Sequence, residues 1–90
     1  MTQDTQKPEP SFGQVKTVSE LGRLIRAFRK KGNLTLQTVS GLTNVSMRFL
    51  SELERGKETA ELGKALSTIN KLGLEVIIQP RGYSQQRLRK

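Results

Sequence analysis

Residues 35–55 read TLQTVSGLTNVSMRFLSELER, and this stretch decides the fold. Thr35 and Ser46 are typical caps of a helix N-terminus, because their hydroxyls accept hydrogen bonds from free backbone N–H groups. Asn44 lies two residues before the second cap and tolerates the left-handed backbone of a tight turn. The stretch therefore predicts two short helices joined by a short turn, over residues 36–43 and 47–55.

The second of these helices has two chemically different faces. At about 100° per residue, the apolar and polar side chains separate on a helical wheel. The two groups are Phe49, Leu50 and Leu53 on one side and Arg48, Ser51 and Arg55 on the other. One face is therefore suited to packing, and the other is suited to approaching a groove in DNA. Two helices of these lengths have the dimensions of a helix-turn-helix, in which the second helix reads the major groove.

A longer helix is predicted before this stretch. Thr17 followed by Glu20 fits a capping box, and Gly32 with Asn33 favours an end of the helix. Ordered structure is expected to begin at Thr17. The apolar residues follow helical spacing and share one face, which consists of Leu21, Leu24, Ile25 and Phe28. The basic residues fall on the other face, which contains Arg23, Arg26 and Lys30.

Another helix is predicted after the stretch, with Thr59 as its cap and Gly73 just beyond its end at Leu72. Its expected inward face consists of Leu62, Ala65, Leu66, Ile69 and Leu72. The predicted helices also contain Gly22, Gly41 and Gly63, each of which costs about 1 kcal/mol relative to alanine. Close packing would explain these glycines.

Residues 74–79, LEVIIQ, change from helical spacing to alternation and are rich in β-branched side chains, so they predict a strand. A lone strand has no hydrogen-bonding partner. The simplest remedy is the same strand of a second subunit, antiparallel across a two-fold axis. The expected dimer contacts are Leu74, Val76, Ile77 and Ile78. The alternative is that this segment extends into solvent or packs as coil.

The composition favours a polyanionic partner. The chain of 90 residues has 16 Lys and Arg against 8 Asp and Glu, a net charge of +8. Its length predicts one domain. We expect four segments: a flexible arm over residues 1–16, a DNA-binding domain over 17–73, a dimerisation strand over 74–79 and a basic tail over 80–90.

The composition also argues against several classes of protein. The chain has no cysteine and no histidine, which removes thiolate chemistry and the commonest general base and metal ligand. We therefore expect no enzyme, no cofactor and no metal site. Apolar runs are too short to span a membrane, which needs about 20 residues, so a cytoplasmic location is expected. A single-stranded RNA reader is disfavoured because aromatic residues for stacking are few.

Residues 21–56 resemble the Xre/Cro-type helix-turn-helix domain. The matching pieces are LGxxIR at 21–26, RK at 29–30, LT at 34–35, VS at 45–46 and FLSELERGK at 49–57. Residues 66–82, which end in LGLEVxIxPRG, further resemble the HipB-like antitoxins, whose last strand pairs across the dimer. The resemblance implies an all-α, lambda-repressor-like bundle of four to five helices, with one C-terminal β-strand pairing across a dimer.

The resemblance also implies roles for single residues. Base contacts would come from Met47, Arg48 and Ser51, and backbone contacts from Thr35, Gln37, Ser46, Arg55 and Lys57. Arg29 and Glu54 would form a structural ion pair. Met47 could instead be exposed filler, and Arg48 could contact only a phosphate. The family often has Gln where this chain has Leu36, which weakens that backbone anchor.

Two functions follow as hypotheses. The first is a dimeric, sequence-specific transcriptional repressor that binds double-stranded DNA at a palindromic operator. The resemblance adds that it would be the antitoxin of a HipA-like kinase toxin and would regulate its own operon. The second is an interaction protein that neutralises such a partner and for which DNA contact is secondary. Co-purification and deletion of residues 1–16 or 83–90 would distinguish them.

Overall fold

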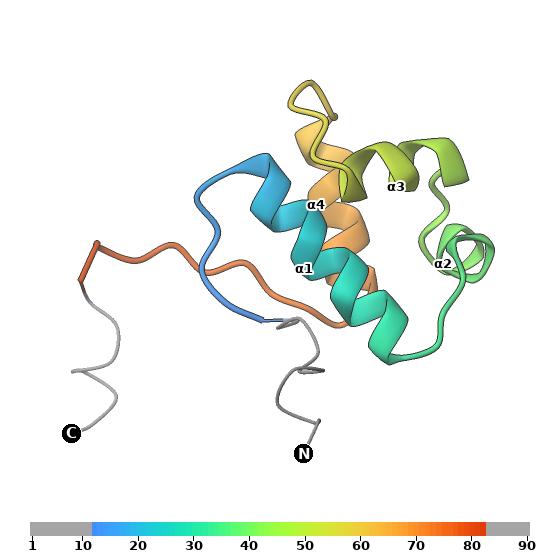
Figure 1. Ribbon diagram of the computed structural model, residues 1–90, viewed down its shortest axis with the longest axis horizontal. Coiled ribbons are helices and arrows are strands. Elements are labelled where there is room, and N and C mark those ends of the chain that lie inside the picture. The colour runs from blue at the N-terminus through green and yellow to red at the C-terminus, as the bar shows by residue number, and fades with distance from the viewer. Residues whose placement is uncertain (1–11, 83–90) are drawn as a thin grey trace, which may run out of the picture.

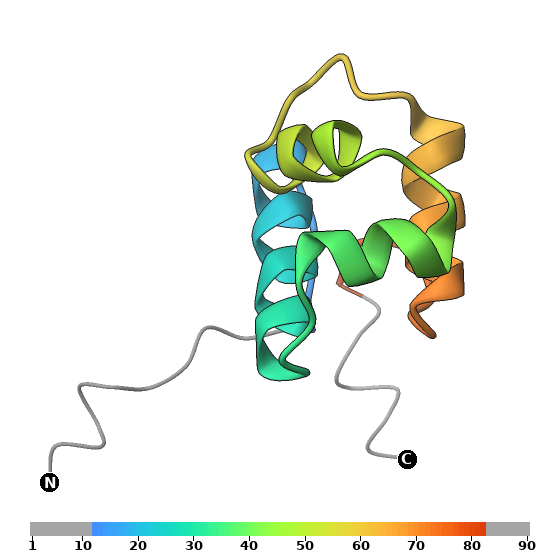
Figure 2. The same ribbon diagram turned by 90° about the vertical axis from the view of Figure 1, so that its right-hand side faces the viewer.

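The computed structural model describes residues 12–82 and has four α-helices there (Figure 1). They are α1 (Val18–Lys31), α2 (Leu36–Thr43), α3 (Met47–Glu54) and α4 (Leu62–Lys71). In Figure 2, α1 and α4 stand at the two sides, and α2 and α3 cross the space between them. The helices pack α1 on α3, α3 on α2 and α2 on α4. This arrangement confirms the predicted all-α bundle.

The termini of the chain extend beyond the described part. Most of the expected arm and of the expected basic tail, residues 1–11 and 83–90, lies outside the described residues. Within residues 12–82, each helix is too short or too polar to cross a lipid bilayer. The first described residue, Phe12, lies beside α1, with its ring edge-on to Phe28 at a centroid distance of 6.3 Å.

The three predicted caps of α1, α2 and α3 are confirmed. The Thr17 hydroxyl accepts from the Glu20 N–H at 3.0 Å, and the Glu20 carboxylate accepts from the Thr17 N–H at 3.2 Å, which completes the capping box. Thr35 accepts from the N–H of Thr38, and Ser46 accepts from the N–H of Phe49, each at 3.0 Å. These bonds satisfy N–H groups that the helices leave free, so the starts of the helices are set locally.

Helices α1, α3 and α4 end in the same motif. A left-handed residue follows each helix: Asn33 with φ 58°, Gly56 with φ 86° and Gly73 with φ 86°. The next N–H then donates back to a carbonyl five residues earlier, at 3.0 Å in each case. These bonds are Leu34 to Arg29, Lys57 to Glu52, and Leu74 to Ile69. This is the Schellman arrangement, in which a left-handed residue lets the chain leave the helix with its last carbonyls satisfied.

The predicted cap of the last helix is wrong. Thr59 does not cap α4; Glu61 occupies the cap position, without a side-chain hydrogen bond to the helix. The physical reason is the turn that follows Gly56, in which the Ala60 N–H donates to the Lys57 carbonyl at 3.1 Å. A residue within that turn cannot also begin a helix, so α4 starts later than its sequence suggests.

The predicted inward face of α4 is partly wrong. Leu62 is 68% exposed and Leu66 is 38% exposed, whereas Ala65 and Ile69 are buried as expected. Thr68 takes the remaining buried place, and its hydroxyl donates to the Lys64 carbonyl at 2.8 Å. A threonine whose hydroxyl is hydrogen-bonded to a carbonyl of its own helix can lie in the core. A prediction based on apolar residues alone therefore misplaces the buried face of α4.

The core lies between α1, α3 and α4. Its buried cluster contains Ile25, Leu53, Ala65 and Ile69, with Leu21, Phe49, Ala60 and Leu74 packed against it. Leu50 of α3 and Val39 of α2 are also buried, at 1% exposure each. The apolar face predicted for α3 is therefore confirmed, and its polar face is directed away from the bundle.

Gly22 fixes how closely α3 crosses α1. A Cβ atom at this position would lie 2.6 Å from the Glu54 carbonyl oxygen and would also meet the carbonyl oxygen of Leu53. Close packing therefore explains this glycine. It does not explain Gly41 and Gly63, where nothing would lie within 4 Å of an added Cβ.

The segment after α4 is extended and unpaired. Within residues 12–82, no strand is present, and 74–80 run without a ladder partner on the side of the bundle away from α2 (Figure 1). Leu74 packs on the core, but Val76, Ile77 and Ile78 are 54%, 72% and 94% exposed. The single chain thus leaves uncovered the apolar side chains that were predicted to pair.

Candidate nucleic-acid interface

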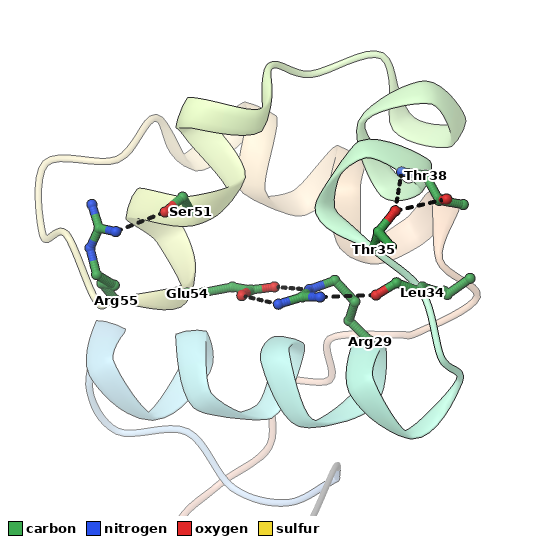
Figure 3. A network of polar contacts seen from close by, with 7 residues as sticks. All are labelled: Arg29, Leu34, Thr35, Thr38, Ser51, Glu54 and Arg55. Carbon is green, nitrogen blue, oxygen red and sulfur yellow. Dashed lines mark hydrogen bonds and ion pairs between the residues drawn. The ribbon is translucent and has the colours of Figure 1, made fainter.

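A buried ion pair joins α1 to α3 (Figure 3). The Arg29 Nε and Nη2 atoms donate to the two carboxylate oxygens of Glu54, at 2.7 and 2.9 Å. The two side chains are only 11% and 6% exposed. The hydrogen bonds that Arg29 donates to Glu54 raise the pKa of Arg29, and the negative charge of Glu54 raises it further, against the opposing effect of burial. The guanidinium therefore stays charged in this partly buried position.

The same guanidinium also reaches the start of α2. The Arg29 Nη1 atom donates to the carbonyl of Leu34 at 2.9 Å, and Leu34 directly precedes the cap of α2, Thr35 (Figure 3). One side chain thus ties α1, α3 and the beginning of α2 together.

The turn between α2 and α3 is fixed by its own hydrogen bonds. Asn44 is left-handed with φ 62°, and its N–H donates to the Ser40 carbonyl at 2.8 Å. The Ser40 hydroxyl donates to the Val45 carbonyl at 2.6 Å. The Ser40 hydroxyl is therefore satisfied within the turn. The relative placement of α2 and α3 is thereby restricted at both ends of α2.

A groove of about 1050 Å³ lies between α1, the N-terminus of α2 and α3. Five residues predicted to contact DNA line it: Thr35, Gln37, Met47, Ser51 and Arg55. Three others predicted for the same role, Ser46, Arg48 and Lys57, are not among its lining residues. The structure therefore divides the predicted contacts into a group in the groove and a group outside it.

Within the groove, the polar face of α3 is already ordered. The Arg55 Nη1 atom donates to the Ser51 hydroxyl at 2.8 Å (Figure 3). Met47 lies at the start of α3 with 46% of its surface exposed. A methionine exposed at this end of the helix is free to make apolar contacts.

Outside the groove, one carboxylate bridges two cations. Glu52 accepts from Lys57 Nζ at 3.0 Å and from Arg48 Nε at 3.3 Å. The hydrogen bond from Lys57, followed by that from Arg48, lowers the pKa of Glu52 below the usual glutamate value. Glu52 is thus ionised at neutral pH. Arg48 is 87% exposed, and its two terminal nitrogens make no hydrogen bond within the described residues.

Residues of α1 in the groove were not predicted as DNA contacts. Arg26 and Lys30 line it, and so does Asn33 in the turn that follows. The signal in the sequence was their place on the polar face of the helix, four residues apart. A helical wheel of one helix does not show which neighbouring helix its polar face lies against. The sequence pattern therefore could not place Arg26 and Lys30 beside α2.

We expect Glu54→Ala to lower the free energy of unfolding by about 3–5 kcal/mol, since it leaves the Arg29 charge buried without its partner. Guanidinium chloride denaturation followed by circular dichroism measures this loss. The matched control is Glu52→Ala, which removes an ion-paired glutamate that is only partly buried and lies two residues away on the same helix. Its loss should be much smaller. Equal losses for the two variants would show that the buried pair does not hold the helices together.

The known proteins similar to this chain are transcriptional regulators. The HTH-type transcriptional regulator y4mF of Sinorhizobium fredii (strain NBRC 101917 / NGR234), itself uncharacterized, is 38% identical over 69 residues, 77% of this chain and 91% of that protein. Transcriptional regulator ClgR of Mycobacterium tuberculosis (strain ATCC 25618 / H37Rv) is 35% identical over 69 residues, 74% of this chain and 62% of ClgR. No family model matches the chain.

Two solved structures share the fold at low sequence identity. One is a HipB-O4 20mer complex, with a TM-score of 0.72 and 13% identity over 78% of this chain and 99% of that chain. The other is a HipA-HipB-O2-O3 complex, with a TM-score of 0.71 and the same identity and coverage. The relatives confirm the resemblance stated for residues 21–56, and the four helices have the fold seen in HipB. The chain belongs to the family of HTH-type transcriptional regulators.

Proposed function

We propose that the protein is a sequence-specific DNA-binding transcriptional repressor that acts as a dimer. The observation that carries this proposal is the division of α3 into a buried apolar face and an exposed polar face beside a cationic groove. Membership in the HTH-type regulators supports it. In this family of motifs, the N-terminal residues of the second helix contact base edges in the major groove.

Arg48 is the residue best placed to choose a base. Its terminal nitrogens make no hydrogen bond within residues 12–82, while Glu52 holds its Nε atom. A guanidinium in this state presents two donors to the O6 and N7 acceptors of guanine, a contact worth about 1–3 kcal/mol of discrimination. Met47 would add an apolar contact, for example with a thymine methyl group, and Ser51 a hydroxyl one turn further on.

The remaining predicted residues would hold the DNA backbone. Thr35 and Gln37 lie at the N-terminus of α2, Ser46 caps α3, and Arg55 and Lys57 follow α3. Each neutralised phosphate adds about 0.9 to the magnitude of the slope of log K against log salt. A dimer would double these contacts, so binding should depend steeply on salt.

DNase footprinting on the region upstream of the protein's own gene tests the repressor proposal. We expect two protected half-sites whose centres lie about 10–10.5 base pairs apart, or a multiple of this. Arg48→Ala should lower the preference for the operator by about 1–3 kcal/mol at one base position. Lys57→Ala, the control, should weaken all sequences equally. Absence of protection at moderate salt would overturn the proposal that the protein regulates its own operon.

The dimer would form through residues 74–79, as two antiparallel strands across a two-fold axis. Support comes from the exposure of Val76, Ile77 and Ile78 and from the extended backbone that pairs with nothing in the described part of the chain. Pairing would satisfy this backbone and cover these side chains. The segment leaves the bundle on the side away from α2 (Figure 1).

We expect Ile78→Asp to convert the dimer into a monomer, measured by analytical ultracentrifugation at micromolar concentration. The carboxylate would have to be desolvated in the interface, which is costly for a charge without a partner. Leu62→Asp is the matched control, because Leu62 is also exposed and apolar but lies on α4. The control should remain dimeric. A wild-type monomer, or two variants that behave alike, would contradict pairing through this segment.

The finer function we propose is that of the antitoxin of a HipA-like kinase toxin. Two observations support it: residues 66–82 resemble those of the HipB-like antitoxins, and the fold is shared with HipB, which was solved in a complex with HipA. The alternative is a partner-binding protein for which DNA contact is secondary.

Co-expression with the product of the neighbouring gene tests the antitoxin role. We expect the two proteins to co-purify and the toxicity of the neighbour to be neutralised. Deleting residues 83–90 separates the two functions if it abolishes neutralisation while footprinting is unchanged. Failure of the two proteins to associate would contradict the antitoxin role and leave the DNA-binding proposal intact.

A further inference from the structure

The groove beside α3 has a second wall that the helix-turn-helix does not provide. This wall is the C-terminal half of α1, from which Arg26 and Lys30 line the groove. The two residues are one helical turn apart, about 6 Å along the axis, and both are exposed. Opposite them lie Met47, Ser51 and Arg55 of α3. The groove is therefore shared between the recognition helix and α1.

The charges of the groove do not cancel. Glu54 is the only acidic residue that lines it, and Arg29 neutralises Glu54 in the buried pair. Among residues 12–82, no carboxylate forms an ion pair with Arg26, Lys30 or Arg55. Three cations therefore remain without compensation on the two walls. Such a surface attracts an anion that is extended enough to meet both walls.

The N-terminus of α2 adds backbone donors to the same groove. The Thr35 hydroxyl already accepts from the N–H of Thr38, but the N–H groups of Leu36 and Gln37 come before the first intrahelical bond. They have no acceptor in the part of the chain that the structure describes. Free N–H groups and the helix dipole favour negative charge at this end. An anion in the groove thus meets cationic side chains and backbone donors together.

We propose that the α1 wall of this groove, together with the N-terminus of α2, binds the sugar-phosphate backbone of DNA and that Arg26 and Lys30 are DNA-contacting residues. The inference rests on the proposed function, since α3 must enter the major groove for the adjoining backbone to lie along α1. It makes α1 a third helix in contact with the duplex. Contacts of this kind orient the protein on DNA and carry no base preference, because phosphates are alike in every sequence.

The test compares the full-length wild-type protein with the double variant Arg26→Gln/Lys30→Gln. Fluorescence anisotropy measures binding to a mixed-sequence duplex and to the upstream region of the protein's own gene, over a range of KCl concentrations. Each lost contact should make the slope of log K against log salt shallower by about 0.9, and the double variant by about 1.8 for each protomer. The ratio of the two affinities at a given salt concentration should not change.

The matched control is Arg23→Gln/Lys31→Gln, which removes the same charge from exposed positions of α1 outside the groove. It should keep the wild-type slope, and Arg26→Lys should keep it too because the charge remains. A wild-type slope in the groove variant, or an equal reduction in the control, overturns the inference and leaves the proposed function standing. A wild-type protein that binds neither duplex overturns both. Circular dichroism verifies that the variants are folded.

Discussion

Arg29 contacts three parts of the fold at once, and the placement of the recognition helix depends on it. Its guanidinium holds Glu54 of α3 and the Leu34 carbonyl, while its own backbone belongs to α1. Burying two charges is expensive and is offset here by the bidentate geometry. The contact forms only when α1, α3 and the start of α2 are in one arrangement. The ion pair therefore contributes mainly by favouring this one arrangement of the helices, and contributes less to the net free energy of folding.

Gly22 acts together with this pair, because the ion pair requires α3 to approach α1 closely. The carbonyls of Leu53 and Glu54 occupy the space that a Cβ atom at residue 22 would need. A Schellman turn at Gly56 then takes the chain away from α3. The last turn of α3 is thus fixed by a glycine beneath it, an ion pair at its side and a turn at its end. The polar face of α3, with Met47, Arg48 and Ser51, is left for a partner.

The sequence predicted those features that depend on a few neighbouring residues. The caps at Thr17, Thr35 and Ser46 are local hydrogen bonds, and each is present. Thr59 failed as a cap because the turn after Gly56 continues to Ala60, and a cap motif alone does not reveal the length of the preceding turn. The pairing of 74–79 is a contact between chains, so a single chain neither shows nor refutes it. The position of Arg26 and Lys30 in the groove depends on tertiary packing, which no local pattern encodes.

The cations of the molecule fall into two classes that should differ in their contribution to binding. Arg48 and Lys57 are held by Glu52, so phosphate must compete with a carboxylate for them, but their side chains lose less freedom on binding. Arg26 and Lys30 have no such partner within the described residues, and so their full charge faces the groove. Free cations release counterions from DNA and set affinity and its salt dependence. Arg48, whose Nε atom is held by Glu52, can present its terminal nitrogens to a base edge, which favours discrimination over strength.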